Sequence, residues 1–171
     1  MPFLLARAKT YAQRNRFDKD QHGIHQQLGR LAALTRVADP QLFQYLENKD
    51  NNAMLFCYRW ILIMFKREFA FHDVMRLWER IWTHHLSPNY HIFICVAILQ
   101  QNRQAILERQ LEFDETLKFV NDLAMNIPVD ATFEAAEVAQ QDKYMKNNFI
   151  FYYYFFFFLV ACRNCLDASA A

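Results

Sequence analysis

Residues 56–82 read FCYRWILIMFKREFAFHDVMRLWERIW. The first part is apolar without a break from Trp60 to Phe65, whereas the second part repeats apolar residues every three or four positions. That second set consists of Val74, Leu77, Trp78, Ile81 and Trp82. An uninterrupted apolar run is typical of a buried helix, and steps of three and four are typical of an amphipathic one. We therefore predict a buried helix over 53–69 and an amphipathic helix over 71–85.

The same kind of spacing continues on both sides of this stretch. A helix over 17–37 is predicted by apolar residues on one face, namely Ile24, Leu28, Leu31, Leu34 and Val37. Asp39-Pro40 ends that helix, because the residue before a proline avoids helical geometry. Further helices are predicted at 41–46, 89–99, 104–109, 113–125 and 130–141. The sequence thus predicts an all-α protein, built as an irregular array of helices.

Composition narrows the class of protein further. Gly23 and Gly29 are the only glycines, which disfavours a protein of strands and tight turns and leaves no glycine-rich phosphate loop. We expect no bound nucleotide or other cofactor. Basic and acidic residues number 19 and 18, and this balance predicts no attraction to nucleic acid. Four cysteines are too few for a disulfide scaffold, and Cys57 and Cys95 lie in apolar stretches, so we expect a cytoplasmic protein.

Three motifs carry a resemblance to a known family. FCYRW at 56–60, FKREF at 65–69 and RLWE at 76–79, followed by Trp82, resemble the second half of a TBC domain. The flanking helices extend the resemblance to residues 17–127, and within the family it is strongest to the branch of members 15 and 17. The resemblance implies an irregular helical array, the C-terminal part of such a domain. Outside it we expect a divergent segment at 1–16, a helical extension at 128–148 and an aromatic low-complexity tail at 149–171.

The resemblance also implies a function. TBC domains act on GTP-loaded Rab-type small GTPases in membrane traffic, and they supply an arginine and a glutamine to the reaction. An arginine supplied in this way accelerates phosphoryl transfer by about 10³–10⁵. In the family these two residues lie in the first half, in I-x-x-D-x-x-R and Y-x-Q motifs. We therefore expect a Rab partner, a regulator rather than an enzyme, and a fragment without catalytic residues.

Two short stretches match the motifs of this arginine and this glutamine, which are called the arginine and glutamine fingers, but both matches are weak. Tyr11-Ala12-Gln13 fits Y-x-Q, but Arg14-Asn15-Arg16 follows where the family has a Gly-Met-Ser-Asp-like run. Arg76 completes a D-x-x-R motif, but it belongs to the RLWE helix, where Glu79 could form a weak ion pair with it. Neither Gln13 nor Arg76 is expected to be catalytic.

Polar residues elsewhere suggest structure rather than chemistry. Arg59 lies inside an apolar helix, so we expect a carboxylate or a carbonyl oxygen to pair with it. We expect Lys66-Arg67-Glu68 to return the chain to solvent. We expect no metal site, because the candidate ligands lack the full set and spacing of a zinc site. Those candidates are His22 with His25, His84 and His85 with His91, and the C-x-x-C pair Cys162 and Cys165.

Residues 149–162 read FIFYYYFFFFLVAC and have neither a helical nor a strand period. Fourteen residues fall short of the roughly 20 that span a membrane as a helix. Three interpretations stay open: the translation of a pyrimidine-rich non-coding stretch, a membrane-associated tail, or a packed C-terminal helix. Two alternatives to the Rab-regulator fragment follow, a non-catalytic Rab-binding or scaffold module and a small tail-anchored membrane protein. Peripheral or tail-mediated contact with endomembranes is thus left open.

Overall fold

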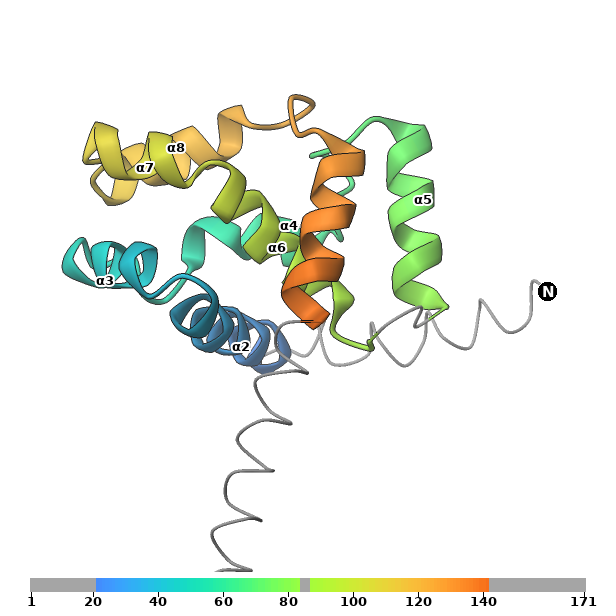
Figure 1. Cartoon of the computed structure of the whole chain (residues 1–171), viewed down its shortest axis with the longest axis horizontal. Coiled ribbons are helices and arrows are strands. Elements are labelled where there is room, and N and C mark those ends of the chain that lie inside the picture. The colour runs from blue at the N-terminus through green and yellow to red at the C-terminus, as the bar shows by residue number, and fades with distance from the viewer. Residues whose placement is uncertain (1–20, 84–86, 142–171) are drawn as a thin grey trace, which may run out of the picture. The chain divides into compact units, whose positions relative to one another are not determined.

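The computed structural model describes residues 21–83 and 87–141, and over these residues the regular elements are helices (Figure 1). The chain divides into two compact units, 1–137 and 138–171. The elements are α2 (His22–Ala38), α3 (Pro40–Asn48), the 3₁₀ turn η1 (Leu55–Cys57), α4 (Tyr58–Leu62), α5 (Phe71–Trp82), α6 (Tyr90–Gln101), α7 (Arg103–Arg109) and α8 (Phe113–Asp122). Residues 129–141 form a further helix. The predicted all-α class is confirmed.

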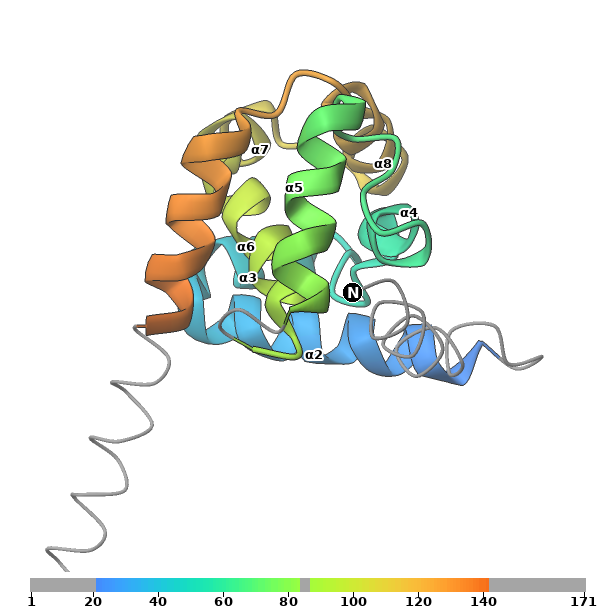
Figure 2. The same ribbon diagram turned by 90° about the vertical axis from the view of Figure 1, so that its right-hand side faces the viewer.

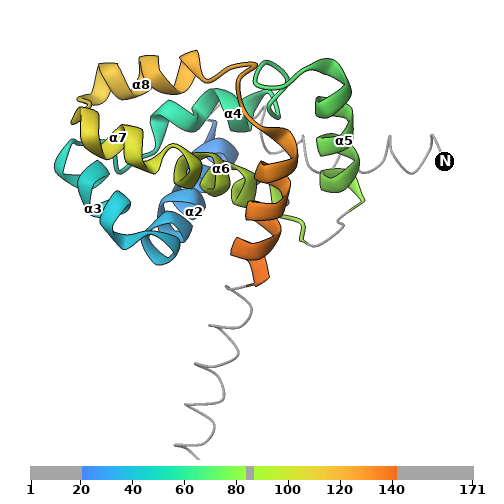
Figure 3. The ribbon, with the colours of Figure 1, turned by 45° about the horizontal axis from the view of Figure 1, so that its top comes forward.

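Helix α6 is the centre of the fold. Every residue from Tyr90 to Leu99 is buried, including the polar His91. Helices α2, α4, α5 and α7 all contact it, and Figure 3 shows it in the middle of them. A helix that is apolar on all sides must be covered on all sides. The prediction assigned this central position to residues 53–69, but α6 occupies it.

The predicted buried helix over 53–69 is wrong in its continuity. Only η1 and α4 are helical, and turns follow over 63–68. Met64 and Phe65 have positive φ angles of 52° and 60°, and this left-handed conformation cannot continue a right-handed helix. The amide of Phe65 instead donates to the carbonyl oxygen of Trp60 at 3.0 Å. The apolar side chains of this run are still mostly buried, so the turns bury what the helix was expected to bury.

Helix α2 shows where counting in steps of three fails. Four of the five predicted core positions are buried, but Val37 is 54% exposed. With 3.6 residues per turn, repeated steps of three drift around the helix, and Val37 falls on the opposite side from Ile24. Thr35 takes the inner position and is 1% exposed, with its hydroxyl donating to the carbonyl oxygen of Leu31.

The break between α2 and α3 is the one predicted. Asp39 caps α3, because its Oδ1 accepts a hydrogen bond from the amide of Leu42 at 3.0 Å. Pro40 follows as the first residue of α3, where a missing amide hydrogen costs nothing.

Candidate functional site

The FCYRW and FKREF motifs meet through an ion pair. The guanidinium of Arg59 donates to both carboxylate oxygens of Glu68, with Nε–Oε1 2.8 Å and Nη2–Oε2 2.9 Å. The side chain of Glu68 is fully buried and that of Arg59 is 27% exposed. A bidentate pair of this kind is short, directional and strong. The predicted need of Arg59 for a partner is confirmed, whereas the expectation that Glu68 faces solvent with Lys66 and Arg67 is wrong.

The RLWE motif joins the same structure. The indole Nε1 of Trp78, on α5, donates to the carbonyl oxygen of Met64 at 2.8 Å. The segments 53–69 and 71–85, which the sequence predicts as two helices, are therefore in contact. Trp60 is completely buried, and its ring centroid lies 6.2 Å from that of Phe65. The aromatic side chains of the family motifs thus act as packing, as predicted.

Arg76 is held on the surface of α5 by two carboxylates. Its Nη1 donates to Asp73 at 3.2 Å and its Nη2 donates to Asp130 at 2.5 Å, on the helix over 129–141. These hydrogen bonds, first that to Asp130 and then that to Asp73, raise the pKa of Arg76. The predicted partner Glu79 is wrong, because Asp73 lies one turn earlier on the same side of α5 and Asp130 comes from a helix packed beside it.

Phe133, on the helix over 129–141, packs against two arginines of α5. The guanidinium of Arg80 lies 4.4 Å from the centroid of the Phe133 ring, and that of Arg76 lies 5.5 Å from it. Arg80 also forms an ion pair with Glu137. Two arginines of α5 therefore serve to attach this helix, and cation–π contacts of this kind are common in such positions.

The candidate metal ligands do not come together among the residues that the structure describes. His22 and His25 are exposed, and the Nε2 of the buried His91 lies 2.9 Å from the Oε1 of Gln27. No group of three potential ligands is found over 21–83 and 87–141. Gln13, His84, His85, Cys162, Cys165 and the segment 149–162 lie outside the described residues. Within the described ranges, no helix is long and apolar enough to cross a membrane.

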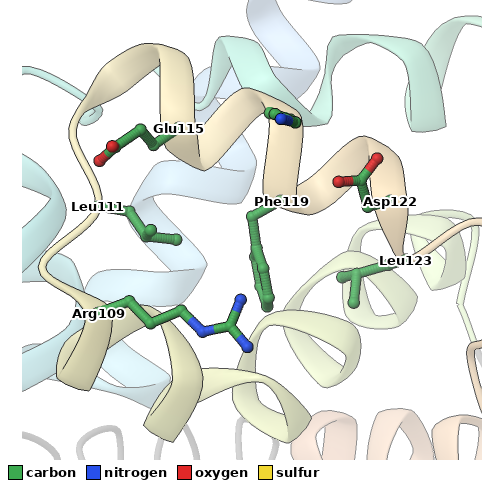
Figure 4. Close-up of a pocket in the computed structure, with 7 residues that line it drawn as sticks. Arg109, Leu111, Glu115, Phe119, Asp122 and Leu123 are labelled. Carbon is green, nitrogen blue, oxygen red and sulfur yellow. The ribbon is translucent and has the colours of Figure 1, made fainter.

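A groove between α7 and α8 is the feature that the sequence reasoning missed. It has a volume of about 450 Å³ and is lined by Arg109, Leu111, Glu115, Lys118, Phe119, Asp122 and Leu123. Figure 4 shows the guanidinium of Arg109 directed toward Phe119, whose ring centroid lies 5.3 Å from it. Phe119 could have indicated this groove from the sequence. In the helix predicted over 113–125 the apolar stripe is Leu117, Val120 and Leu123, and Phe119 is an apolar residue outside it.

The lining of the α7–α8 groove indicates the kind of ligand that it suits. Two cationic and two anionic side chains surround a small apolar floor. A phosphate group would be opposed by Glu115 and Asp122, whereas a protein surface offers both signs of charge and apolar side chains. The groove therefore suits a protein partner better than a small anion.

Comparison with known proteins agrees with the family resemblance of the FCYRW, FKREF and RLWE motifs. The sequence model of the Rab-GTPase-TBC domain matches residues 3–107, and the chain therefore belongs to the Rab-GTPase-TBC domain family. Human TBC1 domain family member 17 is 42% identical over 121 residues, which are 71% of this chain and 19% of that protein. The GTPase-activating protein GYP7 of Saccharomyces cerevisiae is 43% identical over 107 residues, 63% of this chain and 14% of that protein. The predicted resemblance to the family, and to its member 17, is confirmed.

A solved structure shows the same fold. The crystal structure of the Ypt/Rab-GAP domain of Gyp1p superimposes with a TM-score of 0.67 at 23% sequence identity. The match covers 80% of this chain and 42% of that one. The chain spans about a fifth or less of the length of the two curated relatives, human TBC1 domain family member 17 and yeast GYP7.

Proposed function

We propose that this chain is part of a protein that accelerates GTP hydrolysis by Rab-type small GTPases. The observation that carries the proposal is the match of the Rab-GTPase-TBC domain to residues 3–107. The relatives called GTPase-activating proteins support it. The residues matched by the family model also include FCYRW, FKREF and RLWE. The function proposed is regulation of a GTPase, and the chemistry takes place on the GTP bound to that partner.

We also propose that the residues described in the structure supply neither finger of the reaction. A catalytic arginine must extend from the surface and reach the phosphoryl group as charge develops on it. Arg59 and Arg76 of the family motifs do not meet this condition, because Arg59 is paired with Glu68 and Arg76 with Asp73 and Asp130. These residues then serve as the supporting part of the domain, and the arginine and glutamine come from elsewhere in a complete one.

A second candidate is a module that binds a Rab protein or acts as a scaffold without accelerating hydrolysis. The α7–α8 groove favours this alternative, because its mixed charges and its half-buried Phe119 suit contact with a protein. The third, a small tail-anchored membrane protein, depends on residues 149–162 and has no support from the described residues.

Single-turnover release of phosphate from a panel of GTP-loaded Rab proteins tests the absence of fingers. We expect this chain to leave the intrinsic rate unchanged, and Arg76→Ala and Gln13→Ala to make no difference. The complete TBC domain of a curated relative serves as the positive control. An acceleration of about tenfold or more that Arg76→Ala abolishes would contradict the proposal, whereas one that only Gln13→Ala abolishes would assign a finger to a residue outside the described ranges.

Binding to immobilised Rab proteins separates a Rab-binding chain from a chain with no such function. We expect the chain to bind at least one GTP-loaded Rab, and the double variant Lys118→Gln/Phe119→Ala to bind less. Val37→Ala, at an exposed apolar position on α2, is the matched control. Retention of full binding by the groove variant would exclude the α7–α8 groove as the contact, and no binding to any Rab would count against both candidates.

A further inference from the structure

Two turns from distant parts of the sequence meet at one end of the described structure. The amide of Met125, in the turn after α8, donates to the carbonyl oxygen of Glu68, just before α5, at 2.8 Å. Figures 1 and 2 both place the beginning of α5 and the loop after α8 at the same end. Side chains on these two turns therefore contribute to one surface.

This surface is unusually apolar for an exposed one. Phe71 is 82% exposed, Met125 is 66% exposed and Met75 is 45% exposed. Phe71 and Met75 are four residues apart on α5, so their side chains lie on the same side of that helix. Single exposed apolar residues are ordinary, but a group that includes an almost fully exposed phenylalanine indicates a contact surface.

The same end carries unbalanced positive charge. Lys66 and Arg67, in the turn before α5, are exposed, and neither is in an ion pair with a residue that the structure describes. The nearby carboxylates of Asp73 and Asp130 are already bonded to Arg76. The two cations are thus left to interact with a partner.

We propose that Lys66, Arg67, Phe71, Met75 and Met125 form a membrane-contact surface for anionic bilayers. Phenylalanine and methionine side chains enter the boundary between headgroups and acyl chains, while the two cations lie at the level of the lipid phosphates. Because this surface offers two cations and three apolar side chains, the contact is shallow, reversible and sensitive to salt. The surface does not include the α7–α8 groove, so this proposal does not depend on contact with a Rab protein.

Co-sedimentation of the full chain with vesicles tests this membrane-contact surface. One set of vesicles contains phosphatidylcholine alone and the other contains about 30% phosphatidylserine, an anionic lipid of the cytoplasmic leaflet. We expect the chain to bind the anionic vesicles more tightly. Lys66→Gln/Arg67→Gln should weaken that binding by roughly 25-fold, at about fivefold for each cation. Phe71→Gln/Met125→Gln should weaken binding to the anionic vesicles as well.

Matched variants make the outcome decisive. Lys118→Gln removes an exposed cation on α8 and Val37→Gln an exposed apolar side chain on α2, and both should leave binding unchanged. Equal binding by the surface variants and the wild type would overturn the proposal and assign the binding to another segment such as 149–162. No preference for anionic vesicles, or no binding to either set of vesicles, would also overturn it. Because the four changed side chains are exposed, we expect unchanged circular dichroism, and the two double variants test the surface independently.

Discussion

Glu68 is a carboxylate with no access to solvent, and over residues 21–83 and 87–141 its compensating charge comes from Arg59. Removing one member of a buried pair leaves the other charge poorly compensated, which costs about 3–5 kcal/mol. Arg59 is 27% exposed and can recover some hydration, so we expect the lower end of this range for Glu68→Ala. Urea denaturation followed by tryptophan fluorescence measures the loss in the free energy of unfolding.

The control for Glu68→Ala is an exposed pair of the same chemistry. Arg36 and Glu47 are 3.3 Å apart, with side chains 62% and 48% exposed. A pair of this kind contributes between about 0 and 1 kcal/mol, so Glu47→Ala should change stability little. Equal losses in the two variants would show that burial of Glu68 has no special cost, and the proposed role of the Arg59–Glu68 pair would then fail.

The thiol of Cys57 should be unreactive in the folded protein. Burial, and then the neighbouring Cys95 and Glu68, raise the pKa of Cys57 well above its ordinary value. Reaction with iodoacetamide requires the thiolate and access to it, and the fold provides neither. Labelling at about pH 8, located by peptide mass spectrometry, should modify Cys57 only after denaturation in urea. Rapid labelling of the native chain at Cys57 would contradict this prediction.

The raised pKa of Cys57 also fixes the direction of a pH dependence. The folded state keeps the proton more strongly than the unfolded state does. The contribution to stability is therefore complete below the unfolded pKa of about 8.5, and it decreases as the pH rises beyond that value. Cys57→Ala should reduce this alkaline loss of stability, measured as the change in urea midpoint between neutral and alkaline pH.

At the scale of the element, the end of α7 carries avoidable strain. Gln110 follows the last residue of α7 with φ 50° and ψ 43°, a left-handed conformation that glycine adopts without cost. Gln110 is exposed, so Gln110→Gly removes little packing and should stabilise the fold by up to about 1 kcal/mol. Gln104→Gly, inside the same helix, should destabilise it by about 1 kcal/mol. Thermal unfolding of both variants checks the opposite signs.

The elements also show what the sequence could and could not predict. Apolar spacing located α2, α5, α6 and α8, because a buried helix face leaves a regular trace in the sequence. Apolar spacing failed over 53–69, because a turn with left-handed Met64 and Phe65 buries the same side chains without a helix. No glycine, proline or asparagine in 60–69 indicates that turn. The partner of Arg76 and the α7–α8 groove depend on how distant helices pack, which periodicity does not encode.

At the scale of the whole molecule, the described part of the first unit is organised around α6. Helices α2, α4, α5 and α7 contact α6, so α4 and α5, which carry parts of the family motifs, belong to the set of helices around it. The motifs that carry the family resemblance are therefore also structural supports of the core. Their apolar and paired side chains do not need to touch a partner, which agrees with the proposal that the fingers come from elsewhere.

A single core makes a specific prediction about cooperativity. Ile98 on α6 is fully buried, and Ile98→Ala should cost about 2–4 kcal/mol through lost burial and the cavity left behind. If α6 supports all its neighbours, native-state hydrogen exchange should accelerate by the same factor in the slowest amides of α2, α5 and α7. Val37→Ala, which changes a side chain that is 54% exposed, should leave these rates nearly unchanged. Acceleration confined to α6 and one neighbour would mean that the helices open independently, and α6 would then not be the common support of the fold.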